Sequence, residues 1–303
     1  MTWILVLWKK KIYIGTKSSV LKNYYHLTKP GIIRGNLITA LAGFLFAASG
    51  NIHVPSLLAT LTGIALVIAS GCVYNNILDK EIDKGMERTK KRAIPAKSIN
   101  VGSAAVYATI LGLAGFGILY FYTNITTVLV GFTGIIFYVL VYGYVKRRSA
   151  FGTEIGTISG ATPILAGYTA VNGFIDWPAV VLFVIMAVWQ MPHFYAIAIF
   201  RMKEYAKAKI PVLSVKKGIP EVKLRIMVYV AIYTLVATLP TILGYAGITY
   251  GLILFSTGLY WFYKSYASKN KLEINSWARQ NFGISLLVLL IFSTALSLDA
   301  FLP

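Results

Sequence analysis

Three kinds of residue are scarce in this 303-residue chain, and each scarcity excludes something. The single cysteine, Cys72, permits neither an intramolecular disulfide nor a cysteine metal cluster. Charged residues make up 13% of the chain, whereas soluble domains carry roughly 25%, which argues against an ordinary soluble enzyme. Acidic residues number 10 against 29 Lys and Arg, and the formal net charge of +19 indicates either nucleic acid or an anionic membrane surface as the partner.

Apolar residues are abundant instead. They make up 57% of the chain, too many for a disordered protein, and the mean hydropathy of +0.69 favours the membrane. A helix needs about 20 mainly apolar residues to cross a bilayer. We therefore predict an all-α polytopic membrane protein with nine transmembrane helices, near residues 32–50, 56–78, 102–122, 124–145, 154–173, 178–200, 226–245, 247–266 and 281–300.

The positions of the positive charges support this count. All 29 Lys and Arg lie either in the segment up to Arg34 or in the loops after the second, fourth, sixth and eighth predicted spans. By the positive-inside rule these loops and the N-terminal arm (1–27) are cytoplasmic, and the C-terminus is outside. Topology thus accounts for the charge, and we expect no nucleic-acid partner. No compositional linker interrupts the chain, so residues 1–303 are predicted to form one domain.

Four of the ten acidic residues lie within nine positions, at the end of the second predicted span. Asn75, Asp79 and Asp83 are spaced i, i+4, i+8, which places them on one face of a continuing helix. Two carboxylates and an amide oxygen are ligands that suit Mg²⁺, which completes its shell with water and phosphate oxygens. The positive run from Arg88 to Arg92 follows at once, and the combination is typical of a diphosphate site. The alternative is a solvated helix end of mixed charge.

This Asn-x-x-x-Asp-x-x-x-Asp pattern after a second span resembles the first signature of the intramembrane prenyltransferases, the UbiA superfamily. The resemblance extends from Thr28-Lys29-Pro30 to the ninth predicted span. It implies nine helices around a central cavity that opens to the lipid. It also implies an Mg²⁺ site that holds an isoprenoid diphosphate at the cytoplasmic mouth of that cavity.

The end of the sixth predicted span and the loop after it identify a branch of this family. This segment lacks the second Asp-rich stretch, and reads Trp-Gln-Met-Pro-His through His193 and then Ala-Ile-Ala-Ile-Phe-Arg through Arg201. These runs, together with Asn76 and the Met86-Glu87-Arg88-Thr89 run, resemble the protohaem IX farnesyltransferase branch. That resemblance implies Mg²⁺-dependent farnesyl transfer from farnesyl diphosphate to a vinyl group of haem b, which gives haem O in the cell membrane. Haem A synthase or a terminal oxidase is a possible partner.

Residue roles follow from the motif positions. The expected catalytic residues are Asp79, Asp83 and His193, and the expected metal ligands are Asn75, Asp79 and Asp83. The second motif and acceptor site are assigned to Asn76, His193, Glu204 and Tyr195. Tyr138 and Tyr142 are candidates for lining the cavity, and Glu154 is expected as a carboxylate at a helix N-terminus. The candidates for diphosphate binding are Arg88, Lys91, Arg92, Lys146, Arg147, Arg201, Lys203 and Lys209.

Several alternatives stay open at this point. His193 is either a haem iron ligand, a base, or a buried histidine hydrogen-bonded between helices. Another prenyltransferase of the same fold would act on a quinone precursor or a glycerol lipid. A transporter would carry charged groups deep within its spans, whereas the ionisable residues of this chain gather at one face.

Overall fold

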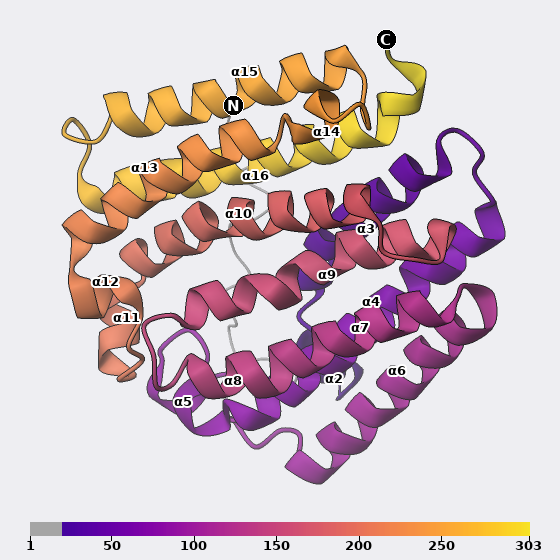
Figure 1. The fold of residues 1–303 in the computed structure, drawn as a ribbon. Coiled ribbons are helices and arrows are strands. Elements are labelled where there is room, and N and C mark those ends of the chain that lie inside the picture. Colours follow the sequence, from indigo (N-terminus) through magenta and orange to yellow (C-terminus); the bar gives the residue numbers. More distant parts are fainter. Residues whose placement is uncertain (1–19) are drawn as a thin grey trace.

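A computed structural model describes residues 20–303, and within this range every regular element is a helix. The predicted all-α architecture is therefore confirmed (Figure 1). Most of the predicted N-terminal arm, residues 1–19, lies outside the described residues. The helices are α2 (Val20–Leu27), α3 (Pro30–Ala48), α4 (Val54–Leu78), α5 (Lys80–Gly85), α6 (Val101–Tyr122), α7 (Ile125–Ile136), η1 (Phe137–Val141), α8 (Tyr142–Val145), α9 (Gly152–Asn172), α10 (Trp177–Phe200), α11 (Met202–Lys207), α12 (Leu213–Lys217), α13 (Ile219–Val236), α14 (Leu239–Ile242), α15 (Ile248–Ala267), α16 (Ile274–Leu298) and η2 (Asp299–Phe301).

Each predicted span has a helix at its position, but the count of nine membrane crossings is not confirmed. Within residues 20–303, seven helical segments are both long and apolar enough to span a bilayer, and α9 and α15 are not among them. The sequence of α9 explains its lower hydropathy, because it is rich in Gly, Thr and Ser and includes an unbroken buried run from Ala161 to Ala170. Small polar residues of this kind allow close packing against neighbouring helices rather than lipid.

The helices α9 and α10 form the centre of the bundle. Helix α9 packs against α3, α7 and α10, and α10 packs in turn against α13 and α16. The contact between α9 and α3 is close enough to require glycine. A Cβ atom on Gly167 would overlap the backbone carbonyl oxygen of Ala40, and one on Gly43 would overlap that of Ile164. These glycines bring two backbones together and fix α3 on the centre of the bundle.

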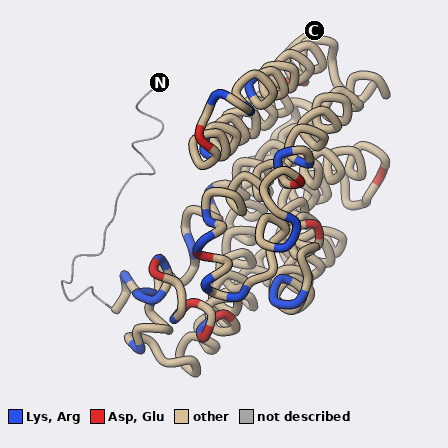
Figure 2. Tube along the Cα trace, turned by 90° about the vertical axis from the view of Figure 1, so that its left-hand side faces the viewer, with Lys and Arg blue, Asp and Glu red and all other residues tan. Residues whose placement is uncertain are grey.

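The Lys and Arg residues gather at one end of the bundle, the end that faces the viewer in Figure 2. The connections at the other end, residues 49–53, 123–124, 173–176 and 243–247, contain neither Lys nor Arg. The short helices α5, α11 and α12 lie together at the charged end, on the left of Figure 1. The two loops that carry the predicted signatures therefore face each other there.

Candidate active site

The Asn75, Asp79 and Asp83 stripe is built on a helix that is almost continuous from α4 into α5. The Asp79 N–H donates to the Asn75 carbonyl at 2.9 Å, and the Asp83 N–H donates to the Asp79 carbonyl at 2.8 Å, so the i, i+4 pattern runs through the junction. All three residues are buried, at 3%, 8% and 4% exposure. The predicted stripe on one helix face is confirmed, and its polar groups lie inside the protein rather than in solvent.

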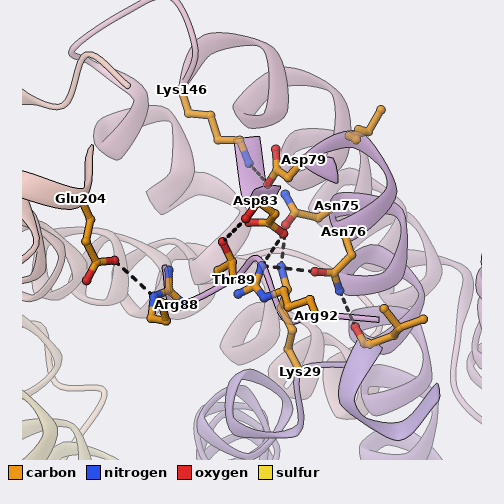
Figure 3. A network of polar contacts seen from close by, with 12 residues as sticks. Lys29, Asn75, Asn76, Asp79, Asp83, Arg88, Thr89, Arg92, Lys146 and Glu204 are labelled. Atoms are coloured by element: carbon orange, nitrogen blue, oxygen red, sulfur yellow. Dashed lines mark hydrogen bonds and ion pairs between the residues drawn. The ribbon is translucent and has the colours of Figure 1, made fainter. Parts of the chain in front are cut away.

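Cations from three other segments bind this stripe, and Figure 3 shows Lys29, Arg92 and Lys146 among them. Lys146 and Arg147, just after α8, donate to the Asp79 carboxylate at 2.5 and 2.9 Å. Arg92 donates to Asp83 at 2.8 Å, and Lys29, just before α3, donates to the side-chain oxygen of Asn75 at 2.6 Å. We call Lys29, Arg92, Lys146 and Arg147 the cation shell.

The cation shell carries four positive charges against two carboxylates, which leaves an excess of two. Burial alone would raise the pKa of Asp79, but the charge of Lys146 and hydrogen bonds from Lys146 and Arg147 hold that pKa below its usual value. Burial, together with the nearby charges of Arg92 and Lys146, lowers the pKa of Lys29 to about 8. Crowded cations of this kind favour an added anion.

Asn76 and Thr89 support the stripe instead of facing the metal position. Asn76 donates to the Leu27 carbonyl at 2.8 Å and accepts from Arg92 at 3.4 Å. Thr89 donates to the backbone carbonyl of Asp83 at 3.0 Å, which folds the loop after α5 back onto the stripe. Asn76 thus orients Arg92 and the segment before α3, and this contact gives the predicted motif residue a structural role.

The second signature contributes a carboxylate between two arginines. Glu204 Oε2 lies 3.6 Å from Arg88 Nε and 3.6 Å from Arg201 Nη1, and within residues 20–303 this buried oxygen has no hydrogen-bond partner. Burial and the nearby charges of Arg201 and Arg92 lower the pKa of Arg88. Because Arg92 belongs to the cation shell, Arg88 lies near that shell. The structure thus brings Arg88 and Arg201 to the site. The other predicted diphosphate ligands, Lys91, Lys203 and Lys209, are exposed, and no contact described within residues 20–303 joins them to the cation shell.

Tyr195 and Glu154 form a separate, partly buried contact. The Tyr195 hydroxyl donates to Glu154 Oε1 at 2.6 Å, and Arg225 lies 3.7 Å from the same oxygen. Glu154 lies in the first turn of α9, as predicted. His193 lies farther along α10, where its Nδ1 is 2.8 Å from Ser285 Oγ on α16.

Tyr138 and Tyr142 are aromatic residues beside the cation shell. Their rings stack with centroids 6.1 Å apart, and Lys146 Nζ lies 5.1 Å from the Tyr142 ring centroid. The central cavity that they are expected to line stays a prediction.

The donor set fits Mg²⁺ bound together with a phosphate ligand. Within residues 20–303 no group of three His, Cys, Asp or Glu side chains converges, so the structure shows no cage that would enclose a metal by itself. Asp79, Asp83 and the Asn75 amide oxygen supply three oxygen donors, and Mg²⁺ commonly takes only one or two carboxylates and fills the rest with water and phosphate. The surrounding cations would contact that phosphate. Sequence reasoning missed Lys29, whose only signal is its position before Pro30 at the start of α3.

Comparisons with known proteins agree with this arrangement. Residues 36–291 match the UbiA prenyltransferase family. The chain is 45% identical to protoheme IX farnesyltransferase 2 of Shewanella woodyi over 277 residues, which cover 90% of this chain and 95% of that protein. It is 43% identical to the protoheme IX farnesyltransferase of Pectobacterium carotovorum, with 94% and 97% covered.

Solved structures share the fold at lower sequence identity. A UbiA homolog from Archaeoglobus fulgidus bound to DMAPP and Mg²⁺ superposes with a TM-score of 0.71 at 15% identity, covering 91% of this chain and 99% of that one. A digeranylgeranylglyceryl phosphate synthase structure superposes with a TM-score of 0.77 at 21% identity, covering 93% and 99%. With the family match over most of the chain, these findings establish that the chain is a membrane-embedded member of the UbiA prenyltransferase family.

Proposed function

We propose that the protein transfers the farnesyl group of farnesyl diphosphate to a vinyl group of haem b, which yields haem O and diphosphate. The observation that carries the proposal is the buried Asp79–Asp83 pair inside a cation shell with an excess of positive charge. Relatives that are 43–45% identical and named protoheme IX farnesyltransferase support haem b as the acceptor.

Asn75, Asp79 and Asp83 are the residues that would hold Mg²⁺. When bound, the ion neutralises charge that develops on the departing diphosphate. The chain's own cations act on the same leaving group. Lys146 and Arg147 already lie against Asp79, so they would contact phosphate oxygens without large movements of the backbone. Arg88, in the loop after α5, and Arg201, at the end of α10, would also contact phosphate oxygens, and Glu204 lies between their side chains.

In the reaction the allylic C–O bond breaks, and its electron pair leaves with the diphosphate. The vinyl carbon then forms a C–C bond to the farnesyl cation, which moves the positive charge to the carbon next to the porphyrin ring. Water adds to that carbon and loses a proton, which gives the hydroxyethylfarnesyl group. The stacked Tyr138 and Tyr142 rings beside Lys146 would stabilise the farnesyl cation by cation–π contact.

We place the protein in the cytoplasmic membrane, with the N-terminus and the site loops cytoplasmic and the C-terminus outside. The gathering of Lys and Arg at the site end of the bundle supports this orientation. Pro303 lies at the opposite end, where its carbonyl accepts from the Thr249 N–H at 3.1 Å. An association with haem A synthase or a terminal oxidase stays a prediction.

The test is product formation in membranes that contain the protein, supplied with haem b, labelled farnesyl diphosphate and Mg²⁺. We expect labelled haem O, identified by chromatography and mass, and we expect its loss on chelation of Mg²⁺. The protein is supplied in parallel with a quinone precursor and with a glycerol lipid acceptor. Label on either of these acceptors and none on haem would overturn the proposal.

A further inference from the structure

His193 is held by residues of two helices at a partly exposed position on α10. Its imidazole stacks on the Trp189 ring at a centroid distance of 4.9 Å and an interplanar angle of 24°. The Phe282 ring of α16 packs against it at 4.9 Å and 34°. The ring orientation is therefore set by packing before any substrate binds.

Ser285 of α16 anchors both aromatic residues of α10. Its hydroxyl oxygen lies 2.8 Å from His193 Nδ1, and its backbone carbonyl accepts from the Trp189 indole N–H at 2.9 Å. Ser285 is fully buried, and Trp189 is 6% exposed. One buried serine thus fixes the histidine and the ring on which the histidine stacks.

The second contact of Ser285 determines where the histidine proton lies. Ser285 Oγ is 2.7 Å from the Phe282 carbonyl oxygen, and two oxygens that close repel each other unless a proton lies between them. A serine hydroxyl has one proton, and a carbonyl has none to give. The Ser285 proton therefore points to Phe282. In the 2.8 Å contact the proton belongs to His193 Nδ1, which leaves the lone pair of a neutral imidazole on Nε2.

The surroundings of the ring favour a metal ligand over a base. A histidine base gains a proton during the reaction, and a carboxylate on its other nitrogen commonly stabilises the resulting cation. Here the partner of Nδ1 is a neutral hydroxyl, and none of the His193 contacts described within residues 20–303 is to a carboxylate. A histidine that ligates a metal is instead a neutral imidazole, and a hydrogen bond to its other ring nitrogen orients it.

We propose that His193 Nε2 ligates the iron of the haem acceptor, and that Ser285 is the positioning residue that fixes the required tautomer. Haem b is the acceptor only under the proposed function, on which this inference rests. The ligation would hold the porphyrin by its iron while a peripheral vinyl group reacts.

The iron itself provides the sharpest test, because protoporphyrin IX has the same vinyl groups and no metal. Full-length protein in lipid nanodiscs is titrated with ferric haem and with metal-free protoporphyrin IX. For the wild type we expect at least about tenfold tighter binding of haem, in the range by which ligand-site contacts change metal affinity. His193→Ala should bind the two porphyrins equally, and added imidazole should restore the nitrogen-ligand absorption spectrum.

Ser285 is tested by two substitutions on the same scaffold. Ser285→Ala should reduce the preference for haem by about two- to tenfold, the worth of one hydrogen bond. Ser285→Thr keeps a hydroxyl and should restore most of that preference. Ser293→Ala, another buried serine of α16, is the matched control and should leave the preference unchanged.

The outcomes separate this inference from the proposed function. If the wild type makes haem O and His193→Ala keeps the same haem spectrum and the same preference for haem, the ligand assignment is wrong. If the wild type makes no haem O, the proposed function is wrong. Should the variants fail to fold, ¹⁵N-histidine labelling of the wild type decides the matter. If the hyperfine couplings in the electron-spin spectrum of the bound ferric haem are the same with labelled and unlabelled histidine, ligation by His193 is refuted.

Discussion

Neutralising Asp79 while keeping its shape separates the charge at this site from its packing. Asp79→Asn retains a side chain of the same size at a position that is 8% exposed, so no cavity forms. The substitution removes the negative charge that Lys146 and Arg147 share at 2.5 and 2.9 Å. It also replaces a carboxylate that the proposed metal site requires.

The two consequences have different sizes. Breaking a fully buried ion pair costs about 3–5 kcal/mol of unfolding free energy. Here the side chains of Asp79, Lys146 and Arg147 are 12%, 13% and 36% exposed, so solvent screens part of the interaction. We expect a loss of about 1–3 kcal/mol. Loss of a metal carboxylate should remove about 3–4 kcal/mol of transition-state stabilisation, which lowers the rate of farnesyl transfer roughly 100- to 1,000-fold.

The measurement is kcat/KM for labelled haem O formation, with thermal unfolding in nanodiscs as the second readout. Glu81→Gln is the matched control, because Glu81 lies two residues after Asp79, on α5, but is exposed and pairs only with Lys84 among the contacts described. We expect the control to retain wild-type kinetics. Activity of Asp79→Asn within threefold of wild type would refute the assignment of Asp79 to the metal, even if the protein were less stable.

Three further predictions concern Lys146, the close approach at Gly167, and the pH dependence of the Asp79 ion pair. Lys146→Gln should raise the KM for farnesyl diphosphate about tenfold, the effect of losing one charge-assisted hydrogen bond. Arg148→Gln, at an exposed position, should leave that KM unchanged. Equal effects of the two substitutions in kinetic assays would show that the cation shell does not bind the diphosphate. Gly167→Ala should lower unfolding free energy by about 1–3 kcal/mol because its Cβ meets the backbone of α3, whereas Gly117→Ala, with open space around it, should not destabilise the protein. The lowered pKa of Asp79 implies that its ion pair stabilises the fold fully above pH 3.8 and is lost as pH falls through the folded-state pKa. Acid unfolding curves of wild type and Asp79→Asn should therefore converge toward low pH, and parallel curves would contradict this.

The local part of the site was predictable from sequence, because helix geometry relates residues four positions apart. The stripe from Asn75 to Asp83 needed only a helix that continues past the end of the span. The backbone does so through Asp79 and buries all three polar groups. This burial is not what a solvated helix end of mixed charge would show.

Which cations bind the stripe was not predictable, because Lys29, Lys146 and Arg147 come from distant parts of the chain. Lys146 is 67 residues from Asp79, and Lys29 is 46 residues from Asn75. Sequence reasoning included Lys146 among eight candidate cations without a means of ranking it. It left Lys29 out, since a lone lysine at a helix start has the same pattern whether it binds a side chain or solvent.

The prediction of the number of membrane crossings failed to be confirmed for a different reason. Hydropathy reports contact with lipid, whereas α9 is in contact with α3, α7 and α10. A helix that is surrounded by other helices can consist largely of small and polar residues and still lie within the membrane. The same composition therefore weakens the hydropathy signal of α9 and allows the backbone contact at Gly167.

Burial distinguishes Lys146 of the cation shell from neighbouring cations that only obey the topology rule. A cation that only obeys the topology rule needs contact with water or lipid headgroups, and burying its charge would cost free energy without benefit. Lys146, with a side chain 13% exposed, is retained at that cost beside Asp79, while Arg148, two residues later, stays exposed over the Tyr144 ring. Both obey the same positive-inside pattern, which is why the sequence could not distinguish them. The site holds more cations than its carboxylates need for neutrality, and Lys146 is buried there all the same. A buried excess cation of this kind therefore identifies the part of the charged face that binds an anion.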